Sequence, residues 1–368
     1  MDMDGVIIAL CAPSRYSGFA TLGDIAMRGG LLKMDSAVES SGDLNAFRPP
    51  WWLRSAHVQS VLPSLKLRRP LLARRARGLL QASRDHVLDC GAGVRLLGHY
   101  SPQADGSGGP RPLALLIHGW EGSAESLYIL SLGAHLYEHG FDIFRLNLRD
   151  HGPTHHLNED IFHSCRIAEV VGAVRAVQDA LSPASLSLAG FSLGGNFSLR
   201  VAARAATAGI RLRKVVAVSP VLSPHRTLTA LESGWFVYHR YFVRKWKQSL
   251  RIKQRIFPAR YDFSDILGEN SLATMTDLMV RQHSEYPDMD TYLSGYSILG
   301  DALADLRVES HVLLADDDPI IPARDARDLA GAPQLHVKVA PYGGHCGFVD
   351  RLGQASWADR MAAQILTA

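Results

Sequence analysis

Residues 185–196 read SLSLAGFSLGGN and carry three local signals in succession. SLSLAG is apolar and small enough for a buried strand, GFSLGG is a G-x-S-x-G turn, and Asn196 begins a run of small residues typical of a helix. A serine in a tight strand-to-helix turn points its hydroxyl out of the sheet, as a nucleophile requires. The glycines two positions before and after Ser192 keep that turn free of bulky side chains. This stretch therefore predicts a reactive serine on a sheet covered by helices.

The rest of the chain alternates between short apolar runs and longer helical patterns. We expect a hairpin of 85–90 and 94–100, strands at 112–119, 141–152, 185–192, 214–220, 310–317 and 335–345, and helices at 123–139, 161–181, 196–208 and 357–366. Apolar strands that alternate with helices indicate a mostly parallel sheet with helices on both faces. The predicted fold class is therefore α/β.

This alternation breaks between two of the predicted strands. Residues 223–305 are far longer than a normal crossover and predict a helical cap insertion over one end of the sheet. The sheet core then comprises 47–222 and 306–368. Residues 1–46 are poorly patterned and form a separate N-terminal segment in this division.

Composition excludes several classes of protein. The chain has 368 residues, 47% of them hydrophobic, and a formal net charge of +3, which fits a globular protein and gives no case for a nucleic-acid partner. Its cysteines have neither disulfide nor zinc spacing; they are Cys11, Cys90, Cys165 and Cys346. The acidic N-terminus lacks the basic region of a secretory signal, and no window has the roughly 18 apolar residues of a membrane span. We expect a cytoplasmic protein.

A second motif, HGWEG at 118–122, follows the predicted strand 112–119. In sheets that carry a nucleophilic serine, this loop supplies one backbone N–H to the oxyanion, and the residue after the serine supplies the other. The two predicted donors are the amides of Trp120 and Leu193. Backbone amides suit this role because they are held in place before charge develops.

Two later loops supply an acid and a base. The loop ADDDPIIP at 315–322 follows a strand, and Asp318 is the preferred acid because its D-x-x-x-P spacing to Pro322 fixes the loop around it. Asp317 is the reserve, and Asp316 is interpreted as a loop cap or a solvated charge. GGHCGF at 343–348 frames His345 with glycines, which leave room for the imidazole over the serine. Serine, aspartate and histidine in this chain order predict a catalytic triad.

These motifs and their flanks resemble the YheT-like group of proteins, also called AB hydrolase family 4. The matching segments are PPWWLRSAHVQSVLP (49–63), HGWEGSAESLY (118–128), NLRDHGPTHHLNEDIFHS (147–164), GFSLGGN (190–196), DMDTYLSGYS (288–297), DDPIIP (317–322) and GGHCGF (343–348). The resemblance covers most of residues 47–365 and implies an α/β-hydrolase fold with a triad of Ser192, Asp318 and His345. Family members are esterases or lipases that act on acyl esters; some eukaryotic members transfer acyl groups to alcohols or cleave phospholipids.

A histidine-rich loop is the main candidate for a metal site. His151, His155, His156 and His163 lie near Glu159 and Asp160, but the chain has no HExxH pattern and a serine triad needs no metal. The H-x-x-x-x-D spacing of His155 and Asp160, which some acyltransferases use, carries little weight in a loop so rich in histidine. No GxGxxG or GxxxxGK[ST] run occurs, so we predict neither a metal nor a cofactor.

The predicted cap contains a helix over Trp235–Lys247 with aromatic and basic residues at helical spacing. We expect its aromatic residues to wall an acyl pocket, and the helix to gate the serine. Its basic residues alternatively form a peripheral contact with anionic membrane. The predicted function is hydrolysis of short- to medium-chain acyl esters. The alternatives are O-acyl transfer to alcohols, a lipase or phospholipase activity on membrane lipids, and a non-catalytic binding protein.

Overall fold

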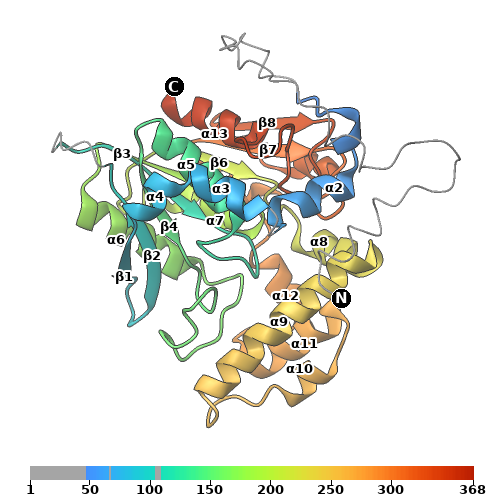
Figure 1. Cartoon of the computed structure of the whole chain (residues 1–368). Coiled ribbons are helices and arrows are strands. Elements are labelled where there is room, and N and C mark those ends of the chain that lie inside the picture. Colours follow the sequence, from blue (N-terminus) through green and yellow to red (C-terminus); the bar gives the residue numbers. More distant parts are fainter. Residues whose placement is uncertain (1–46, 66–67, 104–108) are drawn as a thin grey trace, which may run out of the picture. The chain divides into compact units, whose positions relative to one another are not determined.

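The computed structural model describes residues 47–65, 68–103 and 109–368 (Figure 1). The predicted N-terminal segment 1–46, with Cys11, lies outside the described residues. The other three cysteines, Cys90, Cys165 and Cys346, are buried free thiols. No helix in the described ranges has the length and apolar character needed to cross a membrane.

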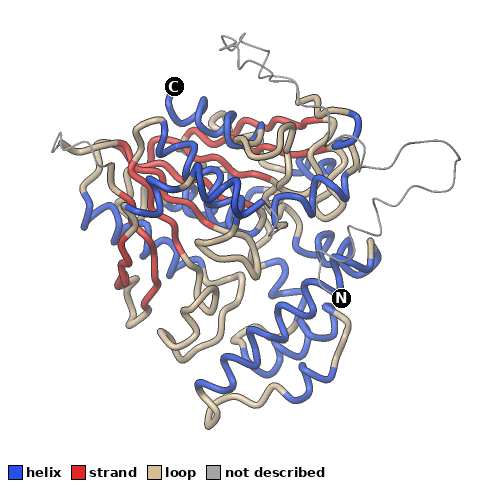
Figure 2. The backbone as a smooth tube through the Cα atoms, in the orientation of Figure 1, coloured by secondary structure: helices blue, strands red, loops and turns tan. Residues whose placement is uncertain are grey.

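One sheet of eight strands runs through the described part of the chain, in the order β1-β2-β4-β3-β5-β6-β7-β8 (Figure 2). The strands are β1 (Arg84–Asp89), β2 (Arg95–Ser101), β3 (Pro112–Ile117), β4 (Asp142–Leu146), β5 (Ser185–Phe191), β6 (Leu212–Val218), β7 (Glu309–Ala315) and β8 (Leu335–Ala340). The β1–β2 and β2–β4 pairs are antiparallel, and all other pairs are parallel. This confirms the predicted α/β class.

Helices cover the sheet and form the segment between β6 and β7. The α-helices are α2 (Ala56–Val61), α3 (Arg69–Arg75), α4 (Arg77–Gln81), α5 (Leu127–Glu138), α6 (Ile167–Leu181), α7 (Leu193–Arg204), α8 (Pro224–Ser233), α9 (Phe236–Ile256), α10 (Ser264–Gly268), α11 (Leu272–His283), α12 (Met289–Ser294) and α13 (Trp357–Thr367). Short 3-10 helices are η1 (Trp51–Leu53), η2 (Leu62–Ser64), η4 (Asp301–Leu303) and η5 (Ala323–Asp328).

The strand order places the helices on two faces. From β3 the chain crosses through α5 to β4 on one side, and from β5 it crosses through α7 to β6 on the other. Right-handed crossovers in opposite directions lie on opposite faces of a parallel sheet. Accordingly α13 packs on α5, whereas α6 packs on α7. The direction reverses between β3 and β5, and the carboxyl ends of strands at such a switch point form a crevice for ligands.

Several predicted boundaries were wrong by a few residues. The helix expected from Asn196 begins at Leu193, directly after the serine, and ends at Arg204. The helix expected from Ile161 begins at Ile167, because the backbone N–H of Phe162 is bound by the Asp150 side chain in a loop. The strand expected at 335–345 ends at Ala340, so the segment with His345 is a loop.

The segment between β6 and β7 contains α8 to α12, which Figure 1 draws in yellow and orange beside the sheet. Ser223 starts α8 by accepting the backbone N–H of Arg226, and Pro224 occupies the first turn, where its missing N–H costs nothing. The helix expected at Trp235–Lys247 begins one residue later and continues to Ile256.

Candidate active site

The turn after β5 holds Ser192 in a strained backbone conformation, with φ 53° and ψ −120°. Its N–H donates to the carbonyl of Val218 at 2.9 Å, which ties the turn to β6. A Cβ atom on Gly190 would lie 2.2 Å from the Gly194 carbonyl oxygen, and one on Gly194 would lie 2.2 Å from that of Ile117. Both positions therefore require glycine, for the reason that the G-x-S-x-G pattern indicates.

The structure brings Ser192, His345 and Asp318 into one hydrogen-bonded series. His345 Nε2 lies 3.0 Å from Ser192 Oγ, and His345 Nδ1 lies 2.9 Å from Asp318 Oδ2. Asp318 Oδ1 accepts the backbone N–H groups of Ile320 at 2.8 Å and Ile321 at 2.9 Å, so the carboxylate is fixed. An anionic acceptor at Nδ1 keeps the proton there and leaves Nε2 free to accept the serine proton.

The three consecutive aspartates have different surroundings. Asp316 is exposed, and Asp317 Oδ1 accepts the backbone N–H of Gly344 at 2.8 Å. Asp317 therefore holds the loop that precedes the histidine, whereas Asp318 contacts the imidazole itself. Partial burial raises the pKa of Asp317, and the charge of Asp318 adds to this effect.

Opposing effects act on the pKa of His345. Burial by itself lowers it, but the Cys346 sulfur and the Asp318 carboxylate together outweigh burial and raise the pKa well above 6.5. A high pKa makes the imidazole a strong proton acceptor. It also means that the neutral form, which a base needs, is reached only at higher pH.

The histidine loop rests on α2, which the sequence analysis did not assign to the site. Ser60 Oγ accepts the backbone N–H of His345 at 2.8 Å. The Gln59 amide bridges the carbonyl of Leu53 and both backbone groups of Val349, each at 2.8 Å. The only sequence signal for this contact was the family-like segment 49–63, because its partners lie almost 300 positions later in the chain.

The turn after β3 is fixed by a buried histidine. The N–H of Leu148 donates to His118 Nε2 at 3.1 Å, so the ring proton is on Nδ1, which lies 2.7 Å from the Gly119 carbonyl oxygen. Burial lowers the pKa of His118 to about 4, which keeps the ring neutral. Trp120 follows this turn and lines one pocket with Ser192 and Leu193. Because Leu193 begins α7, its N–H has no partner within the helix.

Comparisons with known proteins agree with this geometry. A family model described as alpha/beta hydrolase fold matches residues 112–352. The chain belongs to the α/β-hydrolase fold family. It is 23% identical over 247 residues to YheT of Escherichia coli (strain K12), whose name assigns it provisionally to the esterases; the match covers 65% of this chain and 71% of that one. This similarity confirms the resemblance seen in the motifs.

Solved structures share the fold at low sequence identity. An esterase of Pyrococcus furiosus superposes with a TM-score of 0.52 at 14% identity, over 77% of this chain and 90% of that one. A serine hydrolase of Cycloclasticus zankles, a bacterium that degrades polyaromatic hydrocarbons, gives a TM-score of 0.50 at 16% identity, over 77% and 98%.

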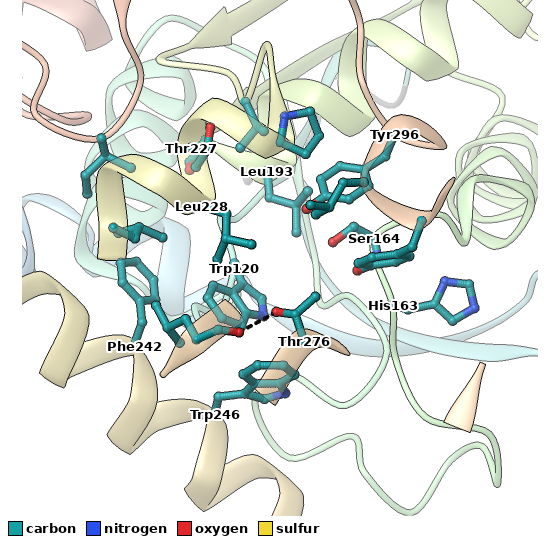
Figure 3. A pocket seen from close by; sticks show the side chains of 18 of the residues that line it. Trp120, His163, Ser164, Leu193, Thr227, Leu228, Phe242, Trp246, Thr276 and Tyr296 are labelled. Carbon is teal, nitrogen blue, oxygen red and sulfur yellow. Dashed lines mark hydrogen bonds between the residues drawn. The ribbon is translucent and has the colours of Figure 1, made fainter. Parts of the chain in front are cut away.

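In this α/β-hydrolase the pocket beside the serine draws most of its wall from the segment between β6 and β7 (Figure 3). Residues of that segment in the wall are Val221, Pro224, Thr227, Leu228, Leu231, Phe242, Trp246, Leu272, Thr276, Met279, Tyr292, Leu293 and Tyr296. The Phe242 ring stacks on Trp120, with centroids 5.2 Å apart and planes 7° from parallel, and Trp246 meets Trp120 edge-on at 5.3 Å.

The expectation that the aromatic residues of α9 together wall this pocket was partly wrong. Phe242 and Trp246 line it, but the Phe236 side chain is 65% exposed. At about 100° per residue, positions four apart share a helix face, whereas positions six apart are turned about 120° away from each other. Phe236 and Phe242 therefore cannot both face the pocket.

The histidine-rich loop of this hydrolase is bound to α9 and the segment after it. Lys253 Nζ is buried and donates to Asp150 Oδ1 at 2.9 Å and to the Asn158 carbonyl at 2.7 Å. His155 Nε2 lies 2.8 Å from Ser249 Oγ, and Asp160 pairs with the Arg260 guanidinium. Of the side chains that were weighed for metal binding or acyl transfer, His155, Glu159 and Asp160 thus join the loop to the helical segment. Among the residues that the structure describes, no group of three potential ligands could hold a metal.

Proposed function

We propose that this chain is a serine carboxylic-ester hydrolase. The observation that carries the proposal is the series Ser192 Oγ, His345 and Asp318, joined at 3.0 and 2.9 Å. In this series the Ser192 hydroxyl, on a strained turn, lies within hydrogen-bond distance of the His345 imidazole. The fixed Asp318 carboxylate orients that imidazole. This arrangement is the one that acyl transfer to serine requires.

The proposed reaction proceeds in two halves. Ser192 Oγ attacks the ester carbonyl carbon as His345 Nε2 takes its proton, and the backbone N–H groups of Trp120 and Leu193 bind the oxyanion. The imidazolium then returns the proton to the leaving alcohol, which leaves an acyl-serine. Water attacks this intermediate with the same base, releases the acid and restores the serine hydroxyl. Asp318 stabilises the imidazolium in both halves.

Family membership and relatives support this activity. The Escherichia coli relative and the Pyrococcus furiosus structure both carry the word esterase in their names. A small-molecule acyl ester is therefore the proposed substrate class. The aromatic wall of Trp120, Phe242 and Trp246 favours short- to medium-chain acyl groups, because stacked rings limit the depth available to a chain.

The activity is tested with a fluorophosphonate probe and a panel of p-nitrophenyl esters of increasing chain length. We expect the probe to label the protein but not the Ser192→Ala variant, and turnover to be fastest on short to medium chains. Added ethanol that diverts product from acid to ethyl ester would favour acyl transfer instead. A folded protein that neither reacts with the probe nor hydrolyses any ester would exclude the proposal.

We also propose that residues 223–305 act as a cap that gates the serine, with 47–222 and 306–368 as the hydrolase core. Support comes from Phe242 and Trp246, which reach from α9 to Trp120 beside the proposed oxyanion site. Cap opening can limit turnover in such enzymes. A cap that gates the serine predicts slower labelling by a bulky fluorophosphonate than by a small one.

The outer face of α9 supports peripheral contact with anionic membrane. Arg244, Arg251 and Arg255 are exposed at spacings of seven and four, which places them on one stripe, opposite the buried Trp246 and Leu250. We expect sedimentation with phosphatidylserine vesicles, weakened by replacing the three arginines with Gln and lost at high salt. Failure to sediment at low salt would end this part of the proposal only.

A further inference from the structure

One side of the pocket carries a group of hydroxyls. Figure 3 shows Ser164 and Tyr296 next to each other, on the side away from Phe242 and Trp246. Tyr292 joins them, since its hydroxyl accepts the backbone N–H of Ser164 at 3.1 Å. All three line the pocket, and Ser164 and Tyr292 are buried. We call Ser164, Tyr292 and Tyr296 the hydroxyl cluster.

The hydroxyl cluster has more protons than internal acceptors use. The Ser164 side chain interacts with the hydroxyls of both Tyr292 and Tyr296. Three hydroxyls in such an open series can donate at most two protons to one another, so at least one remains for a group inside the pocket. A buried hydroxyl proton without an acceptor is costly, and a ligand oxygen would satisfy it.

A buried cation behind the hydroxyl cluster favours an acceptor there. Arg200 is 5% exposed, and its guanidinium donates to the Ser164 carbonyl at 2.8 Å and to Asn196 Oδ1 at 3.3 Å. Within the described ranges no carboxylate forms an ion pair with it. Burial lowers the pKa of Arg200 to about 10, so it stays charged at neutral pH. Its field attracts electron-rich atoms to the adjoining tyrosine hydroxyls.

The hydroxyl cluster is fixed relative to the serine. The Asn196 amide, one helical turn after Ser192, donates to the backbone carbonyls of Val221 and Tyr296, each at 2.8 Å. Tyr296 is thus tied to the helix that begins at the nucleophile. A ligand that reaches from Ser192 to Tyr296 therefore contacts two groups whose separation is fixed. A fixed separation allows the site to select acyl groups by length.

The charge at this end of the pocket favours a neutral acceptor. Glu285 lies 3.3 Å from Nε2 of the pocket-lining His163, so an anionic acceptor at this end would meet a second carboxylate. Elsewhere in the wall, the Thr276 hydroxyl donates to the Leu272 carbonyl at 2.7 Å within α11, whereas the buried Thr227 hydroxyl has no partner among the described residues. The pocket is therefore apolar near Trp246, and apart from Ser192 its spare hydroxyls are those of the hydroxyl cluster and the single one of Thr227.

From this arrangement we infer that the enzyme prefers acyl groups with a neutral oxygen acceptor, such as a ketone, at the far end of the chain. The inference rests on the proposed ester hydrolysis at Ser192 and names its substrate class. The acyl carbonyl lies at the serine, the chain crosses the apolar wall, and the distal oxygen accepts the spare proton of the hydroxyl cluster. Plain acyl chains leave that proton unsatisfied and are poorer substrates.

The test compares matched p-nitrophenyl esters. Pentanoyl, hexanoyl and heptanoyl esters are each paired with the analogue that carries a ketone one carbon from the chain end. We expect one of these lengths to give a kcat/KM about tenfold higher for the oxo ester than for the plain ester. The ratio of the two kcat/KM values is the readout, so changes in the chemical step that affect both esters cancel.

Variants identify the source of the preference. Tyr296→Phe and Ser164→Ala should each bring the ratio close to one, whereas the matched control Thr276→Val should keep the wild-type ratio. Fluorophosphonate labelling of Ser192 reports that each variant is folded. A ratio within twofold of one at every length, with the plain esters hydrolysed, would overturn the inference and leave the proposed function standing. So would a preference that survives in both Tyr296→Phe and Ser164→Ala. Absence of labelling and of all hydrolysis would overturn both.

Discussion

The serine turn and the pocket above it are built in different ways. Around Ser192 the backbone dictates the structure. Gly190 and Gly194 lie so close to backbone carbonyl oxygens that a side chain would not fit at either position. The pocket wall is built from side chains such as Phe242, Tyr292 and Ile320, which come from segments far apart in sequence. A short motif can therefore specify the chemistry, whereas substrate choice depends on how distant segments pack.

The largest effect is expected at the acid. Asp318→Asn should lower kcat by about 10⁴-fold without unfolding the protein, because an amide favours the wrong imidazole tautomer. Asp317→Asn is the matched control and should cost far less, since Asp317 touches the Gly344 amide and not the ring. Steady-state kinetics on one p-nitrophenyl ester measure both. An inactive Asp317→Asn beside an active Asp318→Asn would reverse the two roles.

The next effect concerns the ion pair that joins the histidine-rich loop to α9. Lys253→Met leaves Asp150 buried without its cation, and should lower the free energy of unfolding by about 3–5 kcal/mol in urea titrations. Lys247→Met on the same helix removes only a contact with Asn270 at the surface and should change it by less than about 0.5 kcal/mol. Equal effects of the two variants would mean that Lys253 does not hold the loop.

Chain-length preference should respond to one face of α9. Phe242→Ala opens the wall against Trp120 and should raise kcat/KM for octanoyl relative to butanoyl esters about tenfold. Phe236→Ala, on an exposed side chain, should leave that ratio unchanged. If both variants shift the ratio alike, the pocket wall is not the origin of selectivity.

The smallest effect is expected in the pH dependence of kcat/KM. His345 must be neutral to accept the serine proton, and its pKa lies well above 6.5, so kcat/KM should fall as pH drops through that raised value. Cys346→Ala removes one of the groups that raise the pKa, and the acid limb should then move to lower pH. An unmoved limb would show that Cys346 has no influence on the imidazole.

The sequence was a good guide wherever the determinant was local. The succession of strands and helices along the chain, the glycine-framed serine turn and the three loops at the strand ends followed from short patterns. Asp318 could be preferred to Asp317 from the position of Pro322, and the structure brings Asp318 to the imidazole; its catalytic role stays a prediction. The start of α7 at Leu193 was missed because a serine at positive φ leads directly into the helix.

Other features were out of reach because their partners lie far along the chain. Gln59 contacts Val349, and Lys253 contacts Asp150; no local pattern indicates either pair. The hydroxyl cluster likewise brings Ser164 into one pocket wall with Tyr292 and Tyr296, more than 120 positions away. Such contacts arise from tertiary packing, which residue type and spacing do not encode.

The Gln59 bridge has a consequence for the order of folding. It joins the Gln59 side chain to the backbone of Val349, 290 positions later in the chain, and the loop with His345 lies beside it. Closing so long a loop is entropically costly and slow compared with forming the local serine turn. On refolding, the sheet signal in circular dichroism should therefore return before reactivity toward the fluorophosphonate probe. We therefore expect a newly synthesised chain to become reactive only after Gln59 and Val349 have met.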